Sequence, residues 1–96
     1  MKAELLEHTK VVDEEGNTIE MTLWKLHKPS SDKPHGFKYS LVYINAGERV
    51  IGYDNAEGKG DHRHIRGKEK PYRFTDVWKL VQDFHRDIEK FKRGEL

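Results

Sequence analysis

The sequence predicts a single α+β domain: an antiparallel β-sheet of two hairpins plus an additional strand, with one C-terminal amphipathic helix packed on it. Two observations carry this prediction. Alternating apolar residues form short runs separated by turn residues in the first half of the chain, and apolar residues recur at helical spacing near its end. Hairpins followed by a helix are typical of the α+β class, and the run count indicates about four or five strands.

Composition bounds the size and class of the protein. The 96 residues fit one small domain spanning residues 1–96, with 34% hydrophobic and 36% charged residues. The core must therefore be thin, and aromatic residues, including Trp24 and Trp78, are expected to supply much of its area. The absence of cysteine excludes disulfides, thiolate metal sites and cysteine nucleophiles. No apolar run resembles a signal peptide or a membrane span, so a cytoplasmic protein without membrane contact is expected.

The first predicted hairpin joins residues 3–12 to residues 18–27. Residues 13–17 are a turn cluster containing a glycine, and the second run alternates apolar and polar side chains. Trp24 and Leu26 break that alternation, so we expect a bulge or a sheet with both faces partly covered.

The second predicted hairpin follows a loop at residues 28–36, which holds two of the three prolines. Residues 37–44 alternate strictly, residues 45–48 form a short turn, and residues 49–53 return as a strand.

The helix is predicted from Thr75, as its N-cap, to Arg93, with Gly94 ending it. Its apolar stripe consists of Val77, Leu80, Val81, Phe84, Ile88 and Phe91. We expect the stripe to pack against the sheet, on Leu23, Tyr39, Leu41 or Ile51.

Charge is distributed unevenly along a chain whose net charge is only +1. Residues 1–20 hold two lysines against six acidic residues, whereas residues 59–70 hold five basic residues against two acidic ones. The basic segment also contains glycines and two histidines. It is therefore either an anion-binding surface or a solvated loop, and we expect the stretch 53–74 that surrounds it to be the working surface.

The run Asp61-His62-Arg63-His64 offers several chemistries. An extended backbone would place His62 and His64 on one face, with Arg63 opposite. The two imidazoles could then bind a divalent metal, with Asp54 or Asp61 as a third ligand. A bare His-x-His pattern is a weak metal signal, so metal binding is the less favoured interpretation.

The favoured interpretation is cleavage of RNA without a metal or other cofactor. The ribose 2′-hydroxyl attacks the adjacent phosphate, so an endoribonuclease needs only an acid, a base and stabilisation of phosphoryl charge. His62 and His64 supply acid and base, and Arg63 supplies charge. Gly58 and Gly60 would let backbone N–H groups approach a phosphate. The residues expected to bind nucleic acid are Lys59, Arg66, Lys68, Tyr53, Tyr72 and Arg73.

Two other interpretations remain open. The same groups could bind nucleic acid or a regulator without catalysis. Alternatively, the glycines form a plain turn, the histidines lie on a surface strand, and Tyr72 and Phe74 provide an apolar entry into the helix.

Three short motifs occur in order: Tyr53-Asp54-Asn55, Gly-Lys-Gly-Asp-His-Arg-His at residues 58–64, and Pro-Tyr-Arg-Phe at residues 71–74. With the helix that follows, this pattern resembles the TumE-like family of toxins from type II toxin–antitoxin systems, over about residues 37–91. The resemblance implies a toxin that is neutralised by a helix-turn-helix antitoxin, with RNA as a target and self-association left open. It transfers no catalytic residues, so the site assignment depends on the residue chemistry above.

Overall fold

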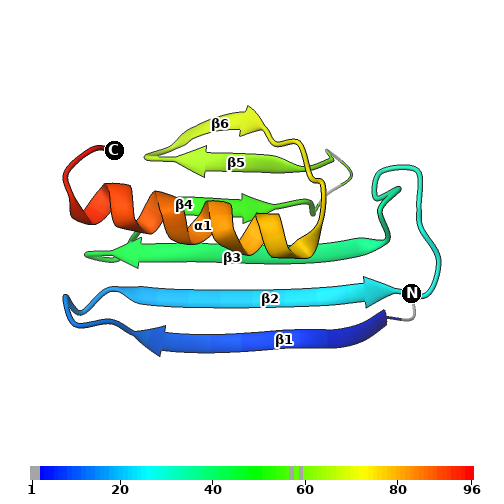
Figure 1. Ribbon diagram of the computed structural model, residues 1–96, viewed down its shortest axis with the longest axis horizontal. Helices are drawn as coiled ribbons and strands as arrows, with labels where there is room; N and C mark the ends of the chain where they lie inside the picture. Colours follow the sequence, from blue (N-terminus) through cyan, green and yellow to red (C-terminus); the bar gives the residue numbers. More distant parts are fainter. Residues whose placement is uncertain (1–2, 57, 59) are drawn as a thin grey trace.

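A computed structural model describes residues 3–56, 58 and 60–96 of the chain. Within this part, six strands form one antiparallel sheet in sequence order, and one helix lies on it (Figure 1). The elements are β1 (Ala3–Val12), β2 (Thr18–Leu26), β3 (Phe37–Asn45), β4 (Glu48–Asp54), β5 (His62–Ile65), β6 (Lys68–Pro71) and α1 (Val77–Lys92). The predicted α+β class is confirmed, and so are both predicted hairpins.

A third hairpin, β5–β6, brings the sheet to six strands, more than the four or five predicted. Arg66 and Gly67 join its strands with φ of 48° and 81°. Positive φ at both central residues is the geometry of a type I′ turn, whose twist matches the flanking strands. Arginine is an unusual residue at such a position, and the polar strand β6 has no apolar alternation to reveal it.

The irregularity expected near Trp24 occurs in the partner strand. The register between β1 and β2 shifts between Leu5 and Glu7, opposite Trp24 and Leu23, so Leu6 is the extra residue of a β-bulge. The bulge in β1 reverses the alternation of side chains between the two faces on either side of Leu6.

Helix α1 begins one residue later than predicted. Its N-cap is Asp76 rather than Thr75, because the Asp76 carboxylate accepts a 2.8 Å hydrogen bond from the Lys79 N–H. The C-terminal end is as predicted: Gly94 has φ of 74°, and its N–H donates to the Phe91 carbonyl.

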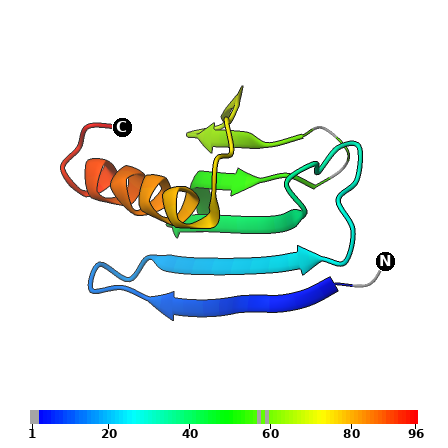
Figure 2. The same cartoon turned by 45° about the vertical axis from the view of Figure 1, so that its right-hand side comes forward.

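The core lies between α1 and the central strands, because the helix runs along the middle of the sheet and leaves β1 and β2 beside it (Figures 1 and 2). Its buried residues are Leu23, Tyr39, Leu41, Tyr43, Val50, Ile51, Tyr53, Leu80, Phe84 and Ile88. Val77 packs at its margin, and Val81 lines an apolar hollow with Leu23. The predicted contact between stripe and sheet is confirmed. Trp78, expected in the core, is 72% exposed, because a residue next to Val77 points about a quarter turn away from the stripe.

Each of the chain's four tyrosines donates its hydroxyl to an aspartate. The pairs are Tyr39–Asp61, Tyr43–Asp13, Tyr53–Asp87 and Tyr72–Asp83. Burial and the neighbouring carboxylates raise the pKa of all four phenols. These tyrosines therefore contribute apolar ring area to a thin core while their hydroxyl groups stay satisfied.

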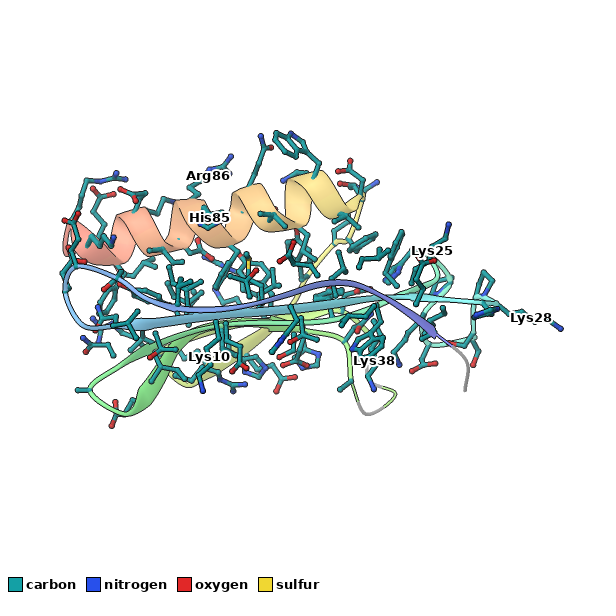
Figure 3. The ribbon with its side chains drawn as sticks, turned by 90° about the horizontal axis from the view of Figure 1, so that it is seen from below. Lys10, Lys25, Lys28, Lys38, His85 and Arg86 are labelled. Carbon is teal, nitrogen blue, oxygen red and sulfur yellow. The ribbon has the colours of Figure 1, made fainter. Side chains whose placement is uncertain are left out.

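Within residues 3–56, 58 and 60–96, the face of the sheet opposite α1 carries no helix. In Figure 3 the sheet is seen edge-on, with His85 and Arg86 on the helix side and Lys10 and Lys38 on the other. We call that second side the open face. In the described part of the chain, no helix has the length and apolar character needed to cross a membrane.

Candidate functional site on the open face

His62 and His64 lie on the open face. His62 pairs with Asp54 across β4 and β5, and Asp54 pairs with Ser40 of β3. Paired residues share a face, and Lys38, two positions from Ser40, points away from the helix in Figure 3. The prediction that the two histidines share one face is therefore confirmed.

The two imidazoles converge on one carboxylate. His62 Nε2 lies 2.5 Å from Asp54 Oδ1, and His64 Nε2 lies 3.6 Å from Asp54 Oδ2. The ring centroids are 4.9 Å apart. On its other side, His62 Nδ1 donates to the Gly60 carbonyl at 3.1 Å. The side chains are only 10% and 13% exposed, so neither is an ordinary surface histidine.

Arg49 completes the cluster and was not identified from the sequence. Its Nη1 lies 3.9 Å from Asp54 Oδ2, and its side chain crosses Gly52, where a Cβ would come within 3.0 Å of Arg49 Cδ. A bulge at Val50 turns Arg49 to the open face, because Tyr43 pairs with Ile51 and the next residue of β3 pairs with Arg49. A glycine inside a predicted strand is the one signal in the sequence of such a close approach.

Burial is the main cause of a lowered pKa at His64, and the positive charge of Arg49 adds to it. Asp54 opposes the shift but does not outweigh these effects. His64 therefore favours its neutral form at neutral pH, with a lone pair free to accept a proton.

Arg63 lies on the other side of β5. Its Nε and Nη2 donate to the two carboxylate oxygens of Asp87, at 2.9 and 2.8 Å. Tyr53, only 2% exposed, donates to the same carboxylate. Arg63 therefore lies apart from His62 and His64. The Tyr53 ring is enclosed by the protein, so it is not exposed for stacking on an RNA base.

Tyr72 and Arg73 lie near Arg63 on the helix side. The three residues line a hollow of about 350 Å³ between β6 and α1. The Tyr72 ring packs edge-on against Tyr53, with centroids 5.0 Å apart, and its hydroxyl donates to Asp83 at 2.6 Å. This packing supports the apolar-entry interpretation of Tyr72, whereas Arg73 is exposed at the rim.

The remaining predicted nucleic-acid contacts are at the β5–β6 edge. Arg66 is exposed, donates to the Leu96 carbonyl at 2.9 Å and lies over the Phe91 ring. Lys68 is exposed and lines a separate hollow of about 230 Å³. Lys59 lies outside the described residues.

Of the two aspartates considered as metal ligands, only Asp54 joins the histidines. Donor atoms of Asp54, His62 and His64 all lie within 4.8 Å of one another. Asp61 instead accepts from Tyr39 at 2.6 Å and contacts His35 Nε2 at 2.9 Å. Asp61 therefore holds the loop before β3 and takes no part in the cluster.

Solvent reaches the cluster from the edge of the sheet. A hollow of about 300 Å³ is lined by Asp61, His62, Glu69, Lys70 and Pro71. The site thus combines two imidazoles, a carboxylate between them and a nearby guanidinium, beside a hollow that opens along β6.

Comparison with known families gives a match over nearly the whole chain. The model of the family described as Toxin TumE matches residues 2–92. The chain belongs to the TumE toxin family. The match extends beyond residues 37–91, the range of the sequence resemblance, and includes the first hairpin. Membership in this toxin family indicates an antitoxin partner. No curated protein and no solved structure matches the chain.

Proposed function

We propose that this chain is the toxin of a type II toxin–antitoxin pair and acts as a metal-independent endoribonuclease. Family membership supports the toxin role. The observation that carries the reaction is the pairing of His62 and His64 on the open face, with Asp54 between them and Arg49 beside them. Two imidazoles in different environments supply the acid and base that RNA cleavage needs.

His64 acts as the base. Burial and Arg49 lower its pKa, so the ring is neutral and accepts the proton of the ribose 2′-hydroxyl. The 2′-oxygen then attacks phosphorus, forms a 2′,3′-cyclic phosphate and displaces the 5′-oxygen. His62 acts as the acid, because its Nδ1–H donates to the Gly60 carbonyl and its Nε2 lies 2.5 Å from Asp54 Oδ1, which orients a proton on Nε2. Its Nε2 proton passes to the departing 5′-oxygen.

Arg49 stabilises the charge that develops on the phosphoryl oxygens. Arg63 was expected in this role, but its guanidinium donates to Asp87 on the opposite face. Arg49 is 42% exposed and beside Asp54, so it can turn towards a bound phosphate. Arg66, Lys68 and Arg73 would hold the flanking strand along the sheet edge.

The experiment is cleavage of RNA by the purified chain in a metal chelator. We expect cleavage to persist, and to be abolished by a 2′-deoxyribose at the cleaved position. His64→Gln should lower the rate by roughly two to four decades. His85→Gln, on the exposed side of α1, is the matched control and should cleave like the wild type. Glutamine is preferable to alanine because the largely buried rings would leave cavities.

A non-catalytic binding module is the alternative. It would bind RNA with a steep salt dependence and yield no product. If the activity is lost in chelator and restored by a metal, the metal-independent mechanism is wrong and the cleavage depends on a metal.

We propose that the partner is a helix-turn-helix antitoxin that covers the basic stretch. Its acidic groups would pair with the exposed cations of the β5–β6 edge, which speeds association and fixes register. Replacing Arg66 and Lys68 together by alanine should weaken the complex, most at low salt. An affinity that these substitutions leave unchanged across a salt series would locate the antitoxin on another surface.

A further inference from the structure

We propose that Asp54, His62 and His64, with Glu69 as a fourth ligand, form a Zn²⁺ site, and that the bound ion inhibits the toxin. Metal binding is argued from geometry alone, whereas the inhibitory consequence rests on the proposed ribonuclease function. The ion would be a regulator of the site and not part of its chemistry.

The donor atoms have the spacing of a metal site. His62 Nε2 lies 2.5 Å from Asp54 Oδ1 and 3.7 Å from Glu69 Oε1, and His64 Nε2 lies 3.6 Å from Asp54 Oδ2. Tetrahedral Zn²⁺ with ligands at about 2.0–2.2 Å separates neighbouring ligand atoms by about 3.3–3.6 Å. Small side-chain rotations would therefore bring Asp54, His62 and His64 around one ion, and Glu69 would reach it by turning its side chain from beside His62.

The orientation of His62 also suits a metal. Its Nδ1–H donates to the Gly60 carbonyl, so Nε2 is the ring nitrogen that faces Asp54 and that would bind the ion once zinc displaces its proton. A backbone carbonyl in this position is a common outer partner of a metal-bound histidine. Glu69 is 43% exposed and lines the hollow beside His62, so an ion can enter from the sheet edge.

The ligand set favours Zn²⁺ over Mg²⁺ or Ca²⁺. Two imidazole nitrogens with one or two carboxylates are typical of zinc sites, whereas Mg²⁺ and Ca²⁺ prefer oxygen ligands. Arg49 opposes the ion because its guanidinium lies 3.9 Å from Asp54. Removing that charge should tighten zinc binding.

Occupation of the site would stop catalysis for a simple reason. Zn²⁺ binds the lone pairs of His62 and His64, and the same ring nitrogens must carry protons during RNA cleavage. Rising zinc should therefore inhibit cleavage, and a chelator should restore it.

The test is calorimetric titration of the full, untagged, metal-free chain with Zn²⁺ at neutral pH. We expect one ion per chain, with binding at least about tenfold weaker in His64→Gln and Glu69→Gln. His85→Gln should bind like the wild type, and Arg49→Ala should bind more tightly. Glu69 is exposed, so its variant remains informative if a histidine variant fails to fold.

The possible outcomes test the metal site and the ribonuclease function separately. Binding that is absent, or that His64→Gln and Glu69→Gln leave unchanged, overturns the metal site and leaves the ribonuclease standing if cleavage persists in chelator. Binding at these residues with inhibition of cleavage supports both. Binding that activates cleavage keeps the metal site but overturns both its inhibitory role and the metal-independent reaction.

Discussion

The two faces of the sheet use ionisable residues in opposite ways. On the helix side, Arg63 and Tyr53 both bond to the buried carboxylate of Asp87. On the open face, His62 and His64 share Asp54, on the side of the sheet away from α1. The covered face satisfies its polar groups within the protein, whereas the open face keeps acid–base groups next to solvent.

In strand β5, neighbouring residues belong to opposite faces of the sheet. Arg63 is between His62 and His64 in the sequence, yet it faces α1 while they face away, because successive side chains of a strand alternate. Residues of one motif therefore lie on opposite faces of the sheet. The comparison predicts that variants on the covered face lower stability and variants on the open face lower activity.

The largest effect is expected in the covered core. Phe84 is fully buried, so Phe84→Ala should lower the free energy of unfolding by about 3–5 kcal/mol, a large part of the stability of a small domain. Denaturant unfolding measures it. Its exposed neighbour His85 provides the control, since His85→Ala should stay within about 0.5 kcal/mol.

Arg49→Ala tests the open face. Loss of a positioned donor should slow RNA cleavage by about two to three decades, or about 2.7–4 kcal/mol in the barrier. Stability should change by less than about 0.5 kcal/mol, because the side chain is 42% exposed. Single-turnover rates and denaturant unfolding report the two quantities. A variant that cleaves normally would remove Arg49 from the mechanism.

Arg63→Met should show the opposite profile. The substitution leaves the buried Asp87 carboxylate without its guanidinium partner, so stability should fall by about 1–3 kcal/mol. The single-turnover cleavage rate of the folded fraction should remain that of the wild type. A rate loss as large as that of Arg49→Ala, with stability intact, would return the charge-stabilising role to Arg63.

The pH dependence of cleavage sharpens the role of His64. A base must be neutral, so the rate should fall as pH drops through the pKa of His64, which burial and Arg49 hold below 6.5. Arg49→Ala removes one cause of that lowering. The acidic limb should move to higher pH, in step with the His64 titration followed by NMR. An unmoved limb would assign it to another group.

The smallest effect concerns acid stability on the covered side. The hydrogen bond from Tyr43 lowers the pKa of Asp13, so this carboxylate stabilises the fold above pH 3.8 and the contribution is lost as pH falls further. Tyr43→Phe should flatten the decline of stability below pH 3.8. Unfolding measured across that range tests it, and an unchanged slope would show that Asp13 is not a source of acid lability.

Several elements could be predicted because their signals are local. The stripe of α1 and its end at Gly94 depend on residues a few positions apart, as do the turns at residues 13–17 and 45–48. The Thr75 cap was wrong by one residue because two neighbouring side chains could both cap the helix, and only the backbone geometry selects Asp76.

The candidate site could be predicted only in part. His62 and His64 were found because period-two alternation places them together once the segment is extended. Tyr53 and Arg63 were expected to contact RNA. Both side chains instead bond to Asp87 of α1, a long-range contact that the local sequence does not reveal. Strand β6 was missed because its polar sequence forms a strand only by pairing with β5.

The sequence by itself determined the α+β class, the helix, four strands and a basic stretch with paired histidines, since each depends on short-range periodicity. Only the tertiary structure decided which face of the sheet is covered and what lies beside the histidines. Arg49 reaches Asp54 through a bulge at Val50, and Asp54 meets His62 through the register of β4 and β5. Register and bulges depend on the packing of the whole sheet against α1, which no local pattern encodes.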